Sequence, residues 1–495
     1  MGVVVRQSIK GMFVNYIGAF IGFLTTFFVV AKFLEPEEYG LTRVILDAAI
    51  LISNVALMGI SASAFRFFPY FQNPKNKDNG FFFYLLIFPT VGLLLCIPAY
   101  LLLKSPISNF FSENSSLFVD YYNWVIPLIC ITVYWVTFET YANLKMRIAV
   151  PKFIREVLVR IMIIVVYLLY AFKILNLNGF IACFISVYGI SMLISFLYIK
   201  KIGNLTLKHD FSFINKGLRQ DISKYTTVLI LGVLGGGLLY QLDIFMVGSQ
   251  LSLRHVGIYS IAANMAIIIE IPSRSIAAIS LPIAAEFFKE GNVREANALY
   301  KKVALHQLIA GGLIFLFLWI NIDTIFAIMP KGDEYSAGKW VVFFIALSKI
   351  IFITFNFGAT LISLSKYYYW TLSFTAIITV IGICANLLLI PKFGITGAAI
   401  ATLTAFVITY TIQQSIVVLK IKGNPLSSNM FKFLILLSTA FALNYLLPVW
   451  SENPIIDGLY RTVIIGVLTL AILYKLKLSD EITSLVMSIR QRIIK

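Results

Sequence analysis

The chain has 495 residues, of which 59% are hydrophobic and only 13% are charged, and its mean hydropathy is +0.89. Soluble globular chains carry roughly 25% charged residues, so this composition excludes a soluble multidomain protein. A net charge of +17 would suggest nucleic acid as a partner of a soluble protein. Here the Lys and Arg residues fall mainly between apolar runs, so we expect an all-α polytopic membrane protein with no nucleic-acid partner.

Apolar runs of about 20 residues recur along the chain and predict about fourteen transmembrane helices. Six are expected at residues 9–33, 41–69, 81–103, 119–143, 156–174 and 179–199. After a polar linker, eight more are expected at residues 224–248, 256–285, 303–323, 338–362, 367–390, 395–419, 431–449 and 458–475. The first run has Arg6 and Lys10 before it and no small-residue cleavage site after it, which indicates a retained helix rather than a signal peptide.

The basic residues predict the orientation of these helices, because cytoplasmic loops hold an excess of Lys and Arg. Lys145, Arg147, Lys152 and Arg155 share one predicted loop, and the linker after residue 199 holds another group. We therefore expect a multi-pass membrane protein with both termini in the cytoplasm. No connection is long enough for an extramembrane catalytic domain, so no enzyme activity is expected.

The cysteines do not indicate a disulfide framework or a metal site. They fall singly inside apolar segments, at Cys96, Cys130, Cys183 and Cys384. We therefore expect no metal and no cofactor.

An internal repeat is visible at a shift of 217 residues. It aligns EYGLTRV, from Glu38, with HVGIYSI, from His255, so that Gly40 falls on Gly257. The repeat predicts an N-lobe at residues 1–205, a cytoplasmic linker at 206–223, a C-lobe at 224–425, and two further helices with a cytoplasmic tail at 426–495. Chance similarity between apolar segments is the alternative. If the repeat is genuine, the substrate site is expected between the lobes, near the middle of the membrane.

Charged side chains inside predicted helices are candidates for function, because each costs about 2.5–3.5 kcal/mol at the bilayer centre. They are Asp47, Arg66, Glu139, Asp243, Glu270, Arg274 and Lys349. Arg66 and Glu139, near the cytoplasmic ends of their helices, are predicted to form a structural ion pair. Asp47 and Asp243 are predicted to act in gating or ion coupling, with solvation at the membrane surface as the alternative.

Glu270 and Arg274 are four residues apart on one helix and can pair with each other, and Pro272 between them predicts a kink. We assign Glu270 to gating or ion coupling and Arg274 to the substrate, and a self-neutralised structural pair is the alternative. Lys349 has no acidic partner in its own helix and is the best candidate for an anionic substrate.

Polar residues at a spacing of seven mark a helix face in each half of the chain. The two sets are Asp47, Asn54 and Ser61, and Lys349, Asn356 and Ser363. Asn15 belongs to a small and polar face of the first helix, together with Gly18 and Gly22, which either packs closely or lines water. The predicted substrate-binding residues are Arg274, Lys349, Asn356, Asn54, Ser61 and Asn15.

The segment AKFLEPEEYGLTRVILDAAILISNVALMGISASAFRFFPYF, from Ala31 to Phe71, resembles the first loop and second helix of O-antigen and exopolysaccharide flippases. With the number of helices and the two lobes, nearly the whole chain resembles the polysaccharide transporter family of the multidrug/oligosaccharidyl-lipid/polysaccharide (MOP) exporter superfamily. In related lipid II flippases an acidic residue of helix two and an arginine of helix eight are important, and Asp47 and Arg274 occupy comparable places. Those flippases also have a basic residue in the first helix, which this chain lacks between Lys10 and Lys32.

The resemblance implies a flippase of the bacterial inner (plasma) membrane. It would move undecaprenyl-diphosphate-linked oligosaccharide, an O-antigen, capsule or exopolysaccharide repeat unit, from the inner to the outer leaflet by alternating access. Coupling to a Na⁺ or H⁺ gradient is expected, and the last two helices are expected to form a groove for the lipid tail. The implied partners are the lipid-linked oligosaccharide, membrane lipids and polysaccharide assembly proteins, and the chain is expected to be a monomer. A cation-coupled drug antiporter or a lipid II flippase of the same superfamily is the alternative.

Overall fold

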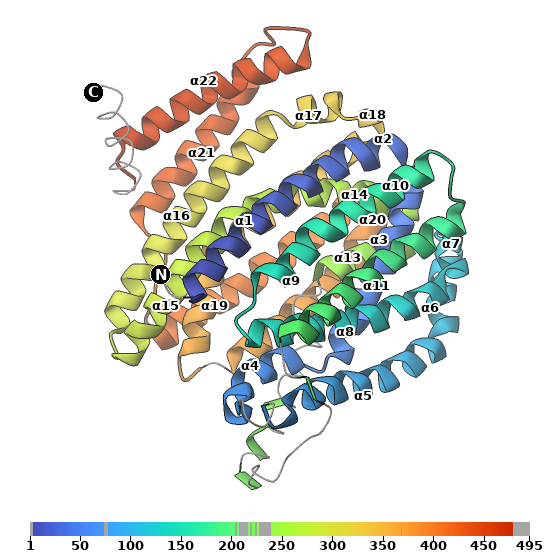
Figure 1. Cartoon of the computed structure of the whole chain (residues 1–495). Coiled ribbons are helices and arrows are strands. Elements are labelled where there is room, and N and C mark those ends of the chain that lie inside the picture. Colours follow the sequence, from blue (N-terminus) through green and yellow to red (C-terminus); the bar gives the residue numbers. More distant parts are fainter. Residues whose placement is uncertain are drawn as a thin grey trace. The chain divides into compact units, whose positions relative to one another are not determined.

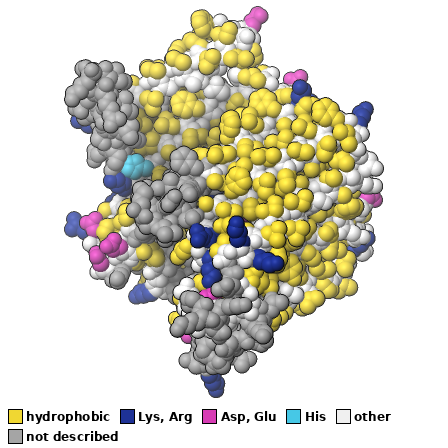
Figure 2. All heavy atoms as spheres, in the orientation of Figure 1, with side chains coloured by type: hydrophobic (Ala, Val, Ile, Leu, Met, Phe, Trp, Pro, Cys, Tyr) yellow, Lys and Arg dark blue, Asp and Glu magenta, His cyan; other side chains and the backbone are white. Residues whose placement is uncertain are grey.

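The computed structural model describes residues 3–73, 78–202, 205–206, 216–217, 220–222, 225–226, 239–367 and 369–478. Every regular element in these ranges is a helix (Figure 1). Eleven described helical runs are long and apolar enough to cross a membrane. Apolar side chains cover most of the described surface that Figure 2 shows, and Leu102, for example, is 82% exposed. Such a surface is stable against lipid, so the predicted class is confirmed: the chain is an all-α polytopic membrane protein.

The chain forms two compact units, Met1–Ser260 and Ile261–Lys495. The boundary between them falls inside one helix, α14 (Leu253–Ile267). The linker predicted at residues 206–223 lies largely outside the described residues, so the predicted lobe boundaries stay a prediction.

The first unit begins with a long helix that includes one π-helical stretch, α1 (Val3–Leu24), η1 (Thr25–Val30) and α2 (Ala31–Phe33). The elements that follow are α3 (Pro36–Ala56), α4 (Ile60–Phe71), α5 (Phe81–Leu102), α6 (Lys104–Ser112), α7 (Ser116–Asp120), η3 (Tyr122–Trp124), α8 (Val125–Leu144), α9 (Ala149–Phe153), η4 (Ile154–Leu158), α10 (Val159–Ala171), α11 (Leu177–Ile202) and α13 (Leu239–Gln250). Helix α8 packs on α3 and α11, while α1 packs on α9 and η4. Helix α3 also contacts α5 and α13, and it carries the ion pair of Arg43 with Asp47.

The second predicted span, 41–69, is two helices rather than one. Helix α3 starts at a capping box of Glu35 and Glu38 with Pro36 in its first turn. It ends at Ala56, and α4 begins at Ile60, because Met58 and Gly59 both have positive φ angles of 49° and 68°. A left-handed residue cannot continue a right-handed helix, so the break is local and sharp.

The second unit contains the rest of α14 and the elements η5 (Ile268–Glu270), α15 (Ile271–Lys289), α16 (Val293–Ile320), α17 (Ile322–Ile328), α18 (Gly332–Tyr335), η6 (Ser336–Gly338), α19 (Lys339–Leu364), α20 (Trp370–Ile416), η7 (Val417–Ile421), α21 (Ser428–Leu446) and α22 (Pro454–Lys475). Helix α19 packs on α16 and along α20, and α21 packs on α16 and α22. Because α19 contacts both α16 and α20, its buried side lies in the core of this unit.

The eleven spans agree with about fourteen predicted helices. The predictions at 367–390 and 395–419 form the single run α20–η7, which is kinked at Gly394, where φ is 59° and ψ is −140°. The prediction at 156–174 corresponds to α9, η4 and α10, in which a π-helical stretch interrupts the α-helix. Most of the prediction at 224–248 lies outside the described residues, and its end is α13.

Candidate functional site

The second unit contains an ion pair inside its membrane-spanning helices. Nζ of Lys349 on α19 lies 2.6 Å from Oε1 of Glu270, and each side chain is 19% exposed. Glu270 ends the 3₁₀ turn η5, and α15 follows with Pro272 in its first turn. The sequence left Lys349 without an acidic partner, and the structure supplies one from a neighbouring helix. The side chain of Arg274, the partner considered for Glu270, lies outside the described residues.

A row of hydrogen-bonding side chains continues from this pair along α19. Asn356, seven residues after Lys349, accepts a hydrogen bond through Oδ1 from the hydroxyl of Tyr410, at 3.3 Å. Tyr410 on α20 also lies near Glu270. Lys349 and Asn356 therefore lie in one polar region, as their spacing predicted. Asn356 is exposed, so part of this region can contact a solute.

Three side chains hold α16 and α20 against α19 beside this polar region. The hydroxyl of Tyr300 donates to Oε1 of Gln414 at 2.8 Å and to the carbonyl oxygen of Phe355 at 3.3 Å. The amides of Gln413 and Gln414 donate to the same carbonyl at 3.1 and 3.3 Å. Because buried polar groups are costly when unpaired, these shared bonds fix the packing of the helices that carry Lys349 and Asn356.

The first unit contains another ion pair, in which the carboxylate is buried. Nη2 of Arg43 lies 3.0 Å from Oδ2 of Asp47, which is 1% exposed. Both residues lie on α3, four residues apart, and Tyr188 of α11 interacts electrostatically with both. Asp47 is one of the residues predicted from the sequence and Arg43 is not, although their spacing of four residues indicates a pair.

Asp243 on α13 is fully buried within the first unit. The hydroxyl of Tyr259, on α14, donates a hydrogen bond to its Oδ2 at 2.8 Å. A buried carboxylate therefore joins α13 to the start of α14. This arrangement disagrees with the alternative of simple solvation at the membrane surface.

The predicted ion pair of Arg66 with Glu139 is wrong. Glu139 pairs with Arg155 at 2.6 Å, and the guanidinium of Arg66 lies 4.3 Å from the ring centroid of Tyr225. Arg155 lies in η4, and its guanidinium pairs with Glu139 of α8. Arg66 is exposed, and stacking on an aromatic ring satisfies its charge without a carboxylate.

The predicted stripe of Asp47, Asn54 and Ser61 is interrupted. Asp47 and Asn54 share α3, but Ser61 follows the break at Met58 and belongs to α4. The hydroxyl of Ser61 lies 3.0 Å from that of Thr140 on α8, so it takes part in helix packing. A spacing of seven places residues on one face only while the helix is continuous.

The face of α1 that includes Asn15 is closely packed at its glycines. A Cβ atom on Gly18 would lie 2.6 Å from Cβ of Glu156, and one on Gly22 would lie 1.6 Å from Nη1 of Arg160. Glu156 and Arg160 form an ion pair at 3.0 Å, which the sequence analysis missed. Asn15 itself is half-buried. Of the two alternatives for this face, close packing and contact with water, close packing therefore describes its glycines.

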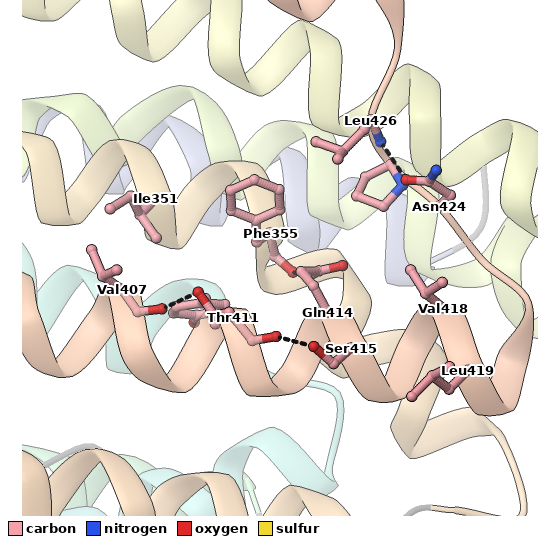
Figure 3. A pocket seen from close by; sticks show the side chains of 12 residues that line it. Ile351, Phe355, Val407, Thr411, Gln414, Ser415, Val418, Leu419, Asn424 and Leu426 are labelled. Carbon is pink, nitrogen blue, oxygen red and sulfur yellow. Dashed lines mark hydrogen bonds between the residues drawn. The ribbon is translucent and has the colours of Figure 1, made fainter.

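A groove of about 550 Å³ lies within the second unit, beside the polar region of α19 (Figure 3). Ile351 and Phe355 of α19 line one side. The other lining residues, from α20, η7 and the segment after them, are Val407, Tyr410, Thr411, Gln414, Ser415, Val418, Leu419, Asn424, Pro425 and Leu426. The groove therefore meets the polar region at Tyr410, which belongs to both.

A family model described as polysaccharide biosynthesis protein matches residues 4–288. The chain belongs to the polysaccharide biosynthesis protein family. The match includes Asp47, Asp243 and Glu270 and ends before Lys349. The Glu270–Lys349 ion pair thus joins the matched region to the part of the chain beyond it.

Two curated relatives resemble this member of the family. Agl15 of Haloferax volcanii, described as a probable low-salt glycan biosynthesis flippase, is 23% identical over 269 residues, which are 53% of this chain and 56% of Agl15. An uncharacterized membrane protein of Methanocaldococcus jannaschii is 22% identical over 437 residues, which are 82% of this chain and 83% of that protein. The chain thus spans about half of the first relative and most of the second.

Solved structures show the same fold for this family member. The lipid II flippase MurJ, in an inward closed conformation, aligns with a TM-score of 0.72 and 15% identity, covering 95% of this chain and 99% of MurJ. An inward-facing multidrug resistance MATE transporter of the MOP superfamily aligns with a TM-score of 0.58 and 14% identity, covering 85% of this chain and 98% of that protein. The chain therefore shares the fold of these two transporters.

Proposed function

We propose that the protein is a flippase that moves a polyprenyl-diphosphate-linked oligosaccharide from the cytoplasmic to the outer leaflet by alternating access. In a bacterial inner membrane the carrier is undecaprenyl diphosphate, and both termini of the protein are cytoplasmic. Coupling to a Na⁺ or H⁺ gradient supplies the driving force. Family membership and the description of Agl15 as a flippase support this class of activity.

The observation that carries the proposal is the Glu270–Lys349 ion pair beside an exposed amide, Asn356. A diphosphate entering a low-dielectric cavity needs a cation and hydrogen-bond donors there. Lys349 supplies the cation, and its exposed fraction leaves it accessible. In this mechanism the substrate phosphate replaces Glu270 at Lys349, and the amide of Asn356 binds the phosphate or the first sugar. Release of the substrate restores the ion pair and resets the site.

A drug antiporter of the same superfamily needs acidic groups that attract a cationic drug. Asp47 and Glu270 are each already paired with a cation, Arg43 and Lys349. Paired carboxylates attract a further cation weakly, so these contacts favour an anionic substrate over a cationic one.

The test is deletion of the gene in its host, followed by extraction of lipid-linked oligosaccharide. The proposal predicts accumulation of the lipid-linked unit on the cytoplasmic leaflet, where an impermeant enzyme added to right-side-out vesicles does not reach it. Restoration by the wild-type gene is the control. An unchanged distribution of the unit between the two leaflets would contradict the proposal.

A further inference from the structure

Two hydroxyls that line the groove between α19 and α20, those of Thr411 and Ser415, are already hydrogen-bonded within the protein. The hydroxyl of Thr411 donates to the carbonyl oxygen of Val407 at 2.7 Å, and the hydroxyl of Ser415 donates to the backbone carbonyl oxygen of Thr411 at 2.9 Å (Figure 3). Oδ1 of Asn424 accepts a bond from the backbone N–H of Leu426 at 3.0 Å. Hydroxyls bound to their own helix offer little to a sugar, so the groove presents an apolar surface to its occupant.

Gln414, another polar lining residue, is turned toward α16 and α19. Its side chain bonds to Tyr300 and to the carbonyl of Phe355. What remains toward the groove is aromatic and aliphatic, with Val418 and Leu419 exposed. An apolar chain fits this lining, and an oligosaccharide does not, because a sugar in the groove would lose hydrogen bonds to water without replacement.

The size of the groove matches a lipid chain in one leaflet. From Val407 to Leu419 the helix rises about 18 Å at 1.5 Å per residue, somewhat more than half of a hydrocarbon core of roughly 30 Å. Its volume of about 550 Å³ is within the roughly 300–1,000 Å³ of ligand sites. The groove therefore accommodates a segment of a long chain lying along the helix.

Exposed lysines follow one end of the groove, and the polar region of the Glu270–Lys349 ion pair adjoins the other. At one end, Lys420 and Lys422 are exposed next to the lining residues Leu419 and Asn424. At the other end, Tyr410 lines the groove and bonds to Asn356, in the polar region of Lys349. An anionic lipid with its chain in the groove can thus place its phosphates at the surface lysines first and at Lys349 later.

We propose that this groove is a binding site for the polyisoprenoid chain of the lipid-linked substrate. The inference rests on the proposed function, because that function supplies the lipid. The groove differs from the one expected between the last two helices, since α19, α20 and η7 form most of its walls. It keeps the chain beside the unit while the diphosphate moves from the exposed lysines to Lys349, where it replaces Glu270.

The experiment is photolabelling of the full-length protein in vesicles with a polyprenyl diphosphate that carries a diazirine in its chain. The labelled residues are mapped by mass spectrometry, with and without a large excess of phosphatidylglycerol. We expect label within residues 407–426 that survives the excess phospholipid. Label that phosphatidylglycerol removes would show that the groove holds bulk lipid, and label only at other residues would show that the polyprenyl chain binds elsewhere. Either result would overturn the inference.

Leu419→Trp fills the groove, and Leu388→Trp is the matched control. Leu419 is 75% exposed and lines the groove, whereas Leu388 is 65% exposed on the earlier half of α20 and does not. We expect Leu419→Trp to lower the labelling roughly tenfold, the change that about 1.4 kcal/mol of lost binding free energy produces. Equal labelling of the two variants, both monodisperse and with unchanged melting temperatures, would also overturn the inference.

Translocation of the lipid-linked oligosaccharide is measured in the same vesicles, so the two proposals fail separately. Translocation by the wild type without label in the groove overturns the groove and leaves the flippase intact. Absence of translocation overturns the proposed function, and with it the assignment of the groove to the substrate chain.

Discussion

Within the first unit, Gly40 of α3 lies directly against α14, and Gly257 of α14 lies directly against α3. A Cβ atom on Gly40 would lie 1.9 Å from the carbonyl oxygen of Leu253 and 3.1 Å from the backbone nitrogen of Gly257. One on Gly257 would lie 2.1 Å from the carbonyl oxygen of Pro36. These are the two glycines that the shift of 217 residues aligns. The first turns of α3 and α14 therefore cross in backbone contact, which only glycine permits.

Alanine at either glycine is expected to separate the two helices. Gly40→Ala and Gly257→Ala should each lower the free energy of unfolding by about 1–3 kcal/mol, the usual cost of overpacking. Denaturant unfolding in detergent micelles measures the change. Gly189→Ala on α11 is the control, because its Cβ would meet only Ile131 at an ordinary 3.5 Å. A loss of stability in the control as large as in Gly40→Ala would refute the close crossing.

Breaking the Glu270–Lys349 ion pair should destabilise the second unit, because it leaves one partly buried charge alone. We expect Lys349→Ala to lower the free energy of unfolding by about 1–3 kcal/mol, between the values for exposed and fully buried pairs. The exchange variant Lys349→Glu/Glu270→Lys should recover most of this stability. It should not recover transport if the substrate phosphate binds Lys349 on α19, because the exchange moves the cation to position 270. Full transport by the exchange variant would argue against direct contact of Lys349 with the substrate.

The Arg43–Asp47 pair is expected to be structurally important because Asp47 is almost fully buried. Asp47→Asn should lower the free energy of unfolding by about 3 kcal/mol, since it leaves Arg43 without its carboxylate. Asp323→Asn is the control. Asp323 is 77% exposed and pairs with Lys339 at 2.6 Å, and such exposed pairs contribute at most about 1 kcal/mol. Equal effects of the two substitutions would show that burial of Asp47 does not matter.

The break between α3 and α4 makes a prediction of its own. Gly59 has a φ angle of 68°, so Gly59→Ala should cost about 1–2 kcal/mol of unfolding free energy. If the region were instead one continuous helix, alanine would stabilise it, because alanine favours helix over glycine by about 1 kcal/mol. The sign of the change in melting temperature therefore distinguishes the two structures.

The sequence was sufficient for the class of the fold because hydropathy alone decides it. Apolar runs longer than the bilayer requires can only be spanning helices when they recur from end to end. It was insufficient for the break at Met58 and Gly59, because one glycine in an apolar run also occurs in continuous helices. Only the backbone angles of both residues reveal the interruption.

The candidate site was predictable where the pattern lies within one helix. The spacing of Lys349 and Asn356 on α19 placed both in one polar region, and Arg43–Asp47 could have been found in the same way. Pairs between helices were not predictable, because they depend on which helices pack together. Glu270 with Lys349 and Glu139 with Arg155 are both of this kind, and proximity to the same membrane surface led to the wrong partner for Glu139.

The most direct test of the proposed mechanism is transport by the purified protein in sealed vesicles. A fluorescent polyprenyl-diphosphate oligosaccharide is placed in one leaflet, and an impermeant quencher reports the fraction that reaches the other. We predict protein-dependent transfer by the wild type and by Asp323→Asn, and loss of transfer in Lys349→Ala that folds and inserts normally. Undiminished transfer in Lys349→Ala, or no transfer by the wild type above that of empty vesicles, would contradict the account.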